Sequence, residues 1–127
     1  MKRYELVVDI YKYVFDGQNE AGGFLFHYEY ENPVTTKATG GSIKPFDSLE
    51  SFGAIYKEQQ MVELYMPYRP SLRDKLGRIR NKTGEVQFVE PDNDSMEFEI
   101  FGIFPQVDMN GRTVDYRVIC KRSVRQN

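Results

Sequence analysis

The chain holds one histidine, His27, and one cysteine, Cys120, two residue types that often act as general base, nucleophile or metal ligand. His27 has no second histidine and no cysteine nearby in sequence, so it lacks the partners that a zinc site needs. Cys120 alternates with apolar residues and is expected to pack as a small core side chain. The two therefore do not suit a catalytic pair, and we predict no catalytic residue, no metal and no cofactor.

The acidic segment Asp92-Asn93-Asp94 superficially resembles part of a calcium loop. An EF-hand loop needs a longer series of ligands that ends in glutamate, and this pattern is absent. The sequence also contains neither a P-loop nor a dinucleotide-binding fingerprint. We expect a surface turn at this segment and predict that the chain is not an enzyme.

Positive charge is concentrated in one stretch, where six basic residues lie within fourteen positions and Asp74 is the only acid. The six are Arg69, Arg73, Lys75, Arg78, Arg80 and Lys82. Such a cluster can contact DNA phosphates or an acidic protein surface, or it can be a solvated loop. The whole chain has a formal net charge of −2, so its overall charge does not predict affinity for nucleic acids.

Alternating apolar and polar residues predict strands along most of the chain. The alternating segments are 3–15, 24–30, 60–66, 96–104 and 114–120. The apolar positions change phase after Ile10, which indicates a bulge or a change of packing partner. Asn110-Gly111 predicts a hairpin in which both residues have positive φ. A second hairpin is expected between 78–82 and 85–90.

A chain of 127 residues predicts a single domain, 1–127, that can bury a core without metals or disulfides. Seven or eight short strands separated by turns favour an all-β fold with long loops and at most one short helix. We expect a mainly antiparallel small β-barrel, or else a sandwich. The basic tail, 121–127, is expected to fray. No apolar run is long enough to cross a bilayer, and we expect no signal peptide and no membrane contact.

The polar segment 47–60 is interpreted as a functional insertion between two strands, 42–46 and 60–66. Its start, the sequence DSLE from Asp47, resembles a helix capping box, and apolar residues follow at helical spacing. Gly53 weakens such a helix by roughly 1 kcal/mol relative to alanine. The segment is therefore either a short, marginal helix or a stretch that orders only against a partner.

Several motifs follow one another in a distinctive order. They are the loop DGQNEAGG, then GGSIKP, YMPYR, RIRNKTGEVQFV, the turn FGIFPQVDMNGR and the closing strand DYRVICKR. This series, from about Asp9 to Arg122, resembles the head closure proteins of long-tailed bacteriophages, also called head-tail joining or stopper proteins. The specificity lies in the order, since no single motif is diagnostic. The segment 89–99 is longer and more acidic than the family pattern.

The resemblance implies a small β-barrel with long excursions and a structural role in the virion. Identical subunits would form a ring at the neck, between the portal with its adaptor protein and a tail terminator or other tail protein. The ring would help to retain packaged double-stranded DNA and would dock the tail, after synthesis of the chain in the host cytoplasm. The insertion would face the central channel through Asp47, Ser48, Glu50, Ser51, Tyr56, Lys57, Gln59 and Gln60.

In such a ring each subunit contacts its neighbour head to tail, through two different patches. The basic cluster at 69–82 would face either an acidic patch within 90–99 of the next subunit or the DNA. We favour the neighbouring subunit, because a channel that must release DNA should not hold phosphates strongly.

The alternative is a single-stranded nucleic-acid-binding barrel, in which exposed aromatic side chains stack on bases near the basic loop. The aromatic residues that would serve are Phe24, Phe26, Tyr28, Tyr65 and Tyr68. This interpretation requires that they lie at the surface, whereas the simpler expectation is that they fill the core.

Overall fold

The computed structural model describes residues 4–43, 61–92 and 94–123. These residues form eight strands and no helix. The strands are β1 (Leu6–Tyr11), β2 (Tyr13–Gln18), β3 (Phe24–Tyr28), β4 (Val34–Ile43), β5 (Met61–Met66), β6 (Lys75–Asn81), β7 (Glu97–Val107) and β8 (Thr113–Arg122). The predicted insertion at 47–60 and most of the predicted frayed tail lie outside the described residues.

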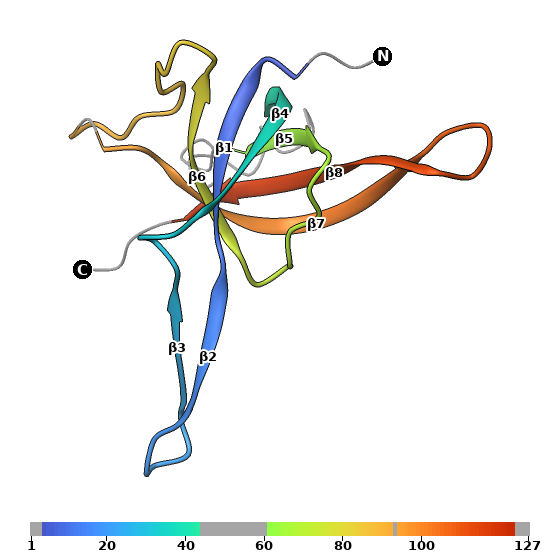
Figure 1. The fold of residues 1–127 in the computed structure, drawn as a ribbon. Coiled ribbons are helices and arrows are strands. Elements are labelled where there is room, and N and C mark those ends of the chain that lie inside the picture. The colour runs from blue at the N-terminus through green and yellow to red at the C-terminus, as the bar shows by residue number, and fades with distance from the viewer. Residues whose placement is uncertain (1–3, 44–60, 93, 124–127) are drawn as a thin grey trace, which may run out of the picture.

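Six strands close into an antiparallel barrel in the order β1-β4-β5-β8-β7-β6 (Figure 1). The barrel closes because β1 pairs with β4 along one edge and with β6 along the other. Closure removes the unpaired strand edges that an open sheet of this size would expose. The predicted all-β fold and small antiparallel barrel are confirmed.

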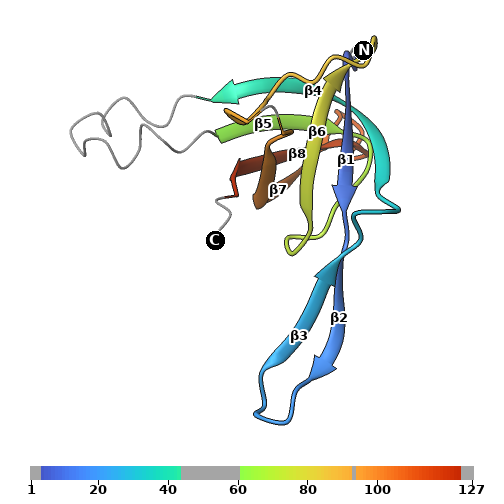
Figure 2. The ribbon, with the colours of Figure 1, turned by 90° about the vertical axis from the view of Figure 1, so that its left-hand side faces the viewer.

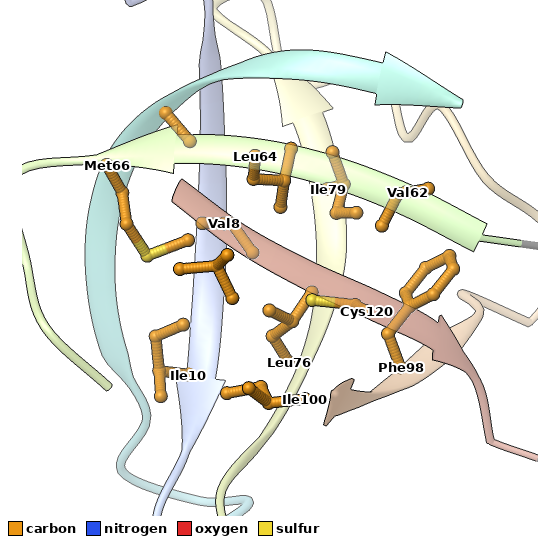
Figure 3. Close-up of a cluster of buried hydrophobic side chains, with 12 residues drawn as sticks. Val8, Ile10, Val62, Leu64, Met66, Leu76, Ile79, Phe98, Ile100 and Cys120 are labelled. Atoms are coloured by element: carbon orange, nitrogen blue, oxygen red, sulfur yellow. The ribbon is translucent and has the colours of Figure 1, made fainter. Parts of the chain in front are cut away.

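The barrel interior is filled by apolar side chains that alternate along the strands (Figure 3). On β5 every second residue, Val62, Leu64 and Met66, is completely buried, because successive strand residues point to opposite faces. Cys120 packs among these side chains, as predicted. The other members of the buried cluster are Val8, Ile10, Ala38, Leu76, Ile79, Phe98, Ile100 and Val118.

A glycine permits the close approach of β4 to β5. Gly40 has a φ of +143° and pairs with Leu64 across the two strands. A Cβ atom at this position would overlap the carbonyl oxygen of Glu63. Only glycine adopts this backbone conformation without strain and leaves room for the neighbouring strand.

The chain changes partners at Lys12, which explains the change of apolar phase in the sequence. β1 lies in the barrel wall, whereas β2 leaves it and pairs only with β3. The two strands form a ribbon that projects away from the barrel, as both views of the chain show (Figures 1 and 2). We call residues 13–30 the β2–β3 arm.

The second projection is the distal part of the β7–β8 hairpin, which extends beyond the barrel wall (Figure 1). Its turn is closed by the carboxylate of Asp108, which accepts hydrogen bonds from the backbone N–H groups of Asn110 (2.9 Å) and Arg112 (3.0 Å). The predicted hairpin is confirmed, but the predicted turn geometry is wrong. Gly111 has a φ of +78°, whereas Asn110 does not have positive φ, because the loop is longer than two residues.

The hairpin predicted between 78–82 and 85–90 forms only in part. β6 ends at Asn81 and is followed by a turn in which Gly84 has a φ of +93°. Beyond the turn the ladder is limited to an isolated bridge between Arg80 and Val86. Instead, β6 pairs directly with β7 in the barrel wall, where Gly77 lies opposite Glu97. The segment between these two strands, 82–96, is therefore a long loop.

Replacement of Leu64 by alanine should lower the free energy of unfolding by about 2–5 kcal/mol, because it leaves a cavity in a filled core. The matched control is Leu72→Ala, the same substitution at a side chain that is 60% exposed. Urea denaturation followed by circular dichroism measures both. Equal stability of the two variants would contradict the core assignment.

Candidate interaction surface

The β2–β3 arm carries a row of aromatic rings on one face. Tyr13 stacks on Phe26 with 5.0 Å between ring centroids, and Phe15 contacts Phe24 at 5.9 Å. Tyr28 continues the row toward the barrel, at 5.7 Å from Phe26. Cross-strand aromatic pairs of this kind stabilise a two-stranded ribbon, which is marginal without them.

This aromatic row faces solvent. Phe24 is 68% exposed, Phe15 53% and Phe26 50%, although all three sit in regular strands. Isolated exposed apolar residues are common on protein surfaces, but a contiguous exposed apolar patch marks an interaction site. Phe24 and Phe26 therefore do not fill the core, which was the simpler expectation for them. Tyr28, Tyr65 and Tyr68 are half-buried.

The opposite face of the arm is polar and acidic. His27 lies between two carboxylates, with Nδ1 at 2.7 Å from Asp16 Oδ2 and Nε2 at 2.9 Å from Glu29 Oε1. The hydrogen bonds to Asp16 and Glu29 raise the pKa of His27 above its usual value of 6.5. Residues 13–36 include four acids and neither lysine nor arginine. Apart from His27, the charged side chains of the arm are therefore all acidic: Asp16, Glu20 and Glu29.

A buried carboxylate fixes the base of the arm to the loop that precedes β6. Asp74 is 6% exposed, and its oxygens accept hydrogen bonds from the backbone N–H groups of Tyr13 (2.9 Å) and Ser71 (2.9 Å). These two residues lie on different parts of the chain. The carboxylate therefore joins the start of β2 to the loop and sets the direction in which the arm leaves the barrel.

An open hollow of about 720 Å³ lies at this junction. Its lining includes three cations, Lys12, Arg69 and Arg73, and Asp74 is its one acid. Apolar surface comes from Tyr68, Leu72 and Ile103. We call this feature the basic hollow. Because three cations outnumber one carboxylate, the net charge of the lining is positive.

The basic cluster that the sequence analysis singled out divides into two groups. Lys75, Arg78 and Arg80 belong to β6, and all three lie within ion-pair distance of an acid of the same chain: Lys75 Nζ is 4.0 Å from Glu97, and Arg80 and Arg78 are 3.2 and 3.9 Å from the buried Asp9.

The remaining cations of the cluster are exposed. Arg73 lies over the ring of Tyr13, 5.5 Å from its centroid, at the edge of the basic hollow. Within the described part of the chain, Arg69 and Lys82 form no ion pair. Arg69 lines the hollow, whereas Lys82 lies in the turn after β6. The cations best placed to contact a partner at the hollow are therefore Arg69, Arg73 and the neighbouring Lys12.

Sequence reasoning missed the residues that make this site. In the sequence Asp74 stands out only as the single acid of a basic run, and no local pattern marks Lys12. The acidic patch predicted within 90–99 is partly used within the chain, since Glu90 pairs with Arg122 and Glu97 lies beside Lys75. The residues predicted to face the channel fall at 47–60, outside the described residues.

His27 and Cys120, the two residues considered for chemistry, lie in different environments. Cys120 is buried in the barrel core, where burial raises the pKa of its thiol and keeps it protonated. His27 is exposed and hydrogen-bonds to the carboxylates of Asp16 and Glu29. Residues 4–43, 61–92 and 94–123 include no cluster of three or more His, Cys, Asp or Glu side chains able to hold a metal ion.

Comparisons with protein-family models, curated proteins and solved structures return no match. Over the described residues, no helix has the length and apolar character needed to span a membrane.

The arm should be more stable at acidic than at alkaline pH. Because the folded pKa of His27 is raised, the protonated ring contributes stability that is fully present below pH 6.5 and is lost as the pH rises through the folded pKa. NMR titration of His27 should give a midpoint above 6.5, with faster amide exchange in β2 and β3 above that midpoint. His27→Gln, the control, should remove the pH dependence. A midpoint at or below 6.5 would show that the carboxylates do not hold the ring.

Replacement of Asp74 by alanine should destabilise the base of the arm, because two backbone N–H groups lose their acceptor. A cost of roughly 1–3 kcal/mol is expected for leaving such groups unsatisfied. The amides of Tyr13 and Ser71 should exchange faster in the variant. Asp94→Ala, at an exposed turn, is the control and should leave both amides unchanged. Unaltered exchange in Asp74→Ala would refute the anchoring role.

Proposed function

We propose that this chain is a structural virion protein of the bacteriophage neck, a head closure subunit that assembles into a ring. The proposal rests on the order of motifs between about Asp9 and Arg122, which resembles that family. In the virion such a ring lies between the portal with its adaptor and the tail terminator or another tail protein. It helps to retain packaged double-stranded DNA and provides the surface on which the tail docks.

One structural observation supports this proposal most: the exposed apolar residues are concentrated on the β2–β3 arm and on the β7–β8 hairpin, whose proximal part lies in the barrel wall. Of the twelve large apolar residues exposed in the described chain, ten belong to the β2–β3 arm or to β7, β8 and their turn. The ten are Phe15, Phe24, Leu25, Phe26, Tyr30, Phe101, Phe104, Val107, Met109 and Val114.

Two separate apolar projections suit a subunit that contacts its neighbours through different surfaces. A ring built head to tail uses one patch of each subunit against another patch of the next. A protein that acts alone has no need to expose ten apolar side chains on two extended hairpins, and such patches favour aggregation unless a partner covers them. The architecture therefore supports a role as a component of an assembly.

The direct test is assembly on connectors made from the portal and adaptor proteins of the same phage. Electron microscopy should show an additional ring on the adaptor side when the chain is added. Met109→Ser should lower the occupancy of that ring, because Met109 is fully exposed at the end of the β7–β8 hairpin. Val89→Ser, which alters an exposed apolar residue outside both projections, should not. Bare connectors after addition of the wild-type chain would exclude the proposal.

A second function, binding of single-stranded nucleic acid, is favoured by the exposed aromatic row of the arm, since bases stack on such rings. The charge of the arm opposes it, because the arm itself contributes three acids, Asp16, Glu20 and Glu29, and neither lysine nor arginine, and these acids repel phosphates. Cations reach the row only at its base, where Arg73 and Lys75 lie over the rings of Tyr13 and Tyr28. Fluorescence anisotropy with labelled oligonucleotides at low and high salt distinguishes the two functions. Salt-dependent binding that Phe26→Ser abolishes would favour the nucleic-acid binder, and absence of binding would remove it.

A further inference from the structure

The β2–β3 arm and the basic hollow have complementary properties. The arm presents three exposed phenylalanine rings, and its charged side chains other than His27 are acidic. The hollow presents Lys12, Arg69 and Arg73 together with the apolar side chains of Tyr68, Leu72 and Ile103. Opposite charges on two surfaces that also carry apolar side chains direct the approach and register of the two surfaces.

The arm of a molecule cannot enter the hollow of the same molecule. The hollow lies at the base of the arm, where Lys12 and Tyr13 contribute to its lining. The six residues of β2 rise by about 3.3 Å each, which places the tip roughly 20 Å away from that base. The tip is a closed turn, held by a hydrogen bond of 2.8 Å from Asn19 N to Gly23 O, so the ribbon does not fold back.

From this geometry we infer that the β2–β3 arm of one copy docks in the basic hollow of a second copy of the same chain. Each subunit then offers an arm to one neighbour and a hollow to the other, which is a heterologous contact that closes into a ring or continues as a filament. This inference rests on the proposed function for its ring geometry, and it assigns the contact that joins neighbouring subunits.

The size of the contact predicts weak pairing in free solution. A phenylalanine side chain buries on the order of 150–250 Å², and about half of that area remains available on each of the three exposed rings. The arm therefore contributes on the order of 300 Å², which is well below the roughly 800 Å² per partner of a stable interface. A closed ring or a template compensates for this small contact area, because each additional contact becomes intramolecular.

Two charge-reversal variants test the arm and the hollow independently. Glu20→Lys alters the exposed tip of the arm, and Arg69→Glu alters the hollow. In a mixture of the two variants, the unaltered arm of Arg69→Glu meets the unaltered hollow of Glu20→Lys. The opposite pairing is weaker, because the reversed tip of Glu20→Lys meets Lys12 and Arg73, which remain in the hollow of Arg69→Glu. Their controls are Glu5→Lys and Lys82→Glu, which make the same charge changes at exposed positions outside both surfaces.

The probe is an NMR spectrum of ¹⁵N-labelled Arg69→Glu protein mixed with unlabelled Glu20→Lys protein. We expect shifts in amides of the arm, at residues 13–30, and none in the labelled hollow. The reverse labelling should move amides at residues 67–74 and not those of the arm tip. Each variant alone should show at least a tenfold weaker concentration dependence of its shifts than wild type or either control. The spectra also verify that each variant is folded.

Several results would overturn the inference. The inference is wrong if the mixture shows no shifts, or if the control variants give equal shifts. It is also wrong if shifts appear on both the arm and the hollow of one labelled chain. Salt-dependent binding of a DNA oligonucleotide that is lost in Arg69→Glu and retained in Glu20→Lys, with no pairing between copies, would assign the hollow to nucleic acid instead.

Failure of this inference is distinguishable from failure of the proposed function. If wild type and both reversals add equally well to connectors, the arm contact is refuted while the head closure role remains. If the mixture shows the one-sided shifts but the chain never adds to connectors, the contact is established and the head closure role is refuted.

Discussion

The closure of β1 against both β4 and β6 is the constraint on which the rest of the structure depends. Once β1 has two barrel partners, the chain that continues from it has no place in the wall and must leave at Lys12. The continuation finds its partner in β3, so the arm is a direct product of barrel closure (Figure 2). The barrel interior is filled by apolar side chains, and binding surfaces must therefore lie on the outside and on the projections.

Charged side chains also serve different purposes in the barrel and at the base of the arm. The buried carboxylate of Asp9 accepts hydrogen bonds from Thr35 Oγ1 (2.9 Å) and Arg80 (3.2 Å), which ties β4 and β6 to β1. Such a pair is costly to break, because the remaining charge would stay buried without a partner. Cations on β6 thus serve the barrel, whereas those before β6 stay exposed beside the arm. A single basic run in the sequence serves two purposes because it crosses from a loop into a barrel strand.

The sequence predicts the barrel well and the interaction surface poorly, for physical reasons. Val62, Leu64 and Met66 alternate because alternate positions of a strand face the core, and that pattern is visible in one chain. Phe24 and Phe26 alternate in the same way but face solvent, and periodicity cannot distinguish these cases. The change of phase after Ile10 was the one local signal of the arm. The role of Asp74 depends on Tyr13, which is 61 positions away, and no local pattern reports such a contact.

The central claim is that the barrel is complete in one chain, whereas the projections become covered only in an assembly. Hydrogen–deuterium exchange of the free chain and of the chain added to connectors tests this claim directly. The account predicts equal protection of β1, β5 and β8 in both states, with protection of the β2–β3 arm increasing only in the assembly. Protection of the arm that is already maximal in the dilute free chain, or that is unchanged on assembly, would contradict it.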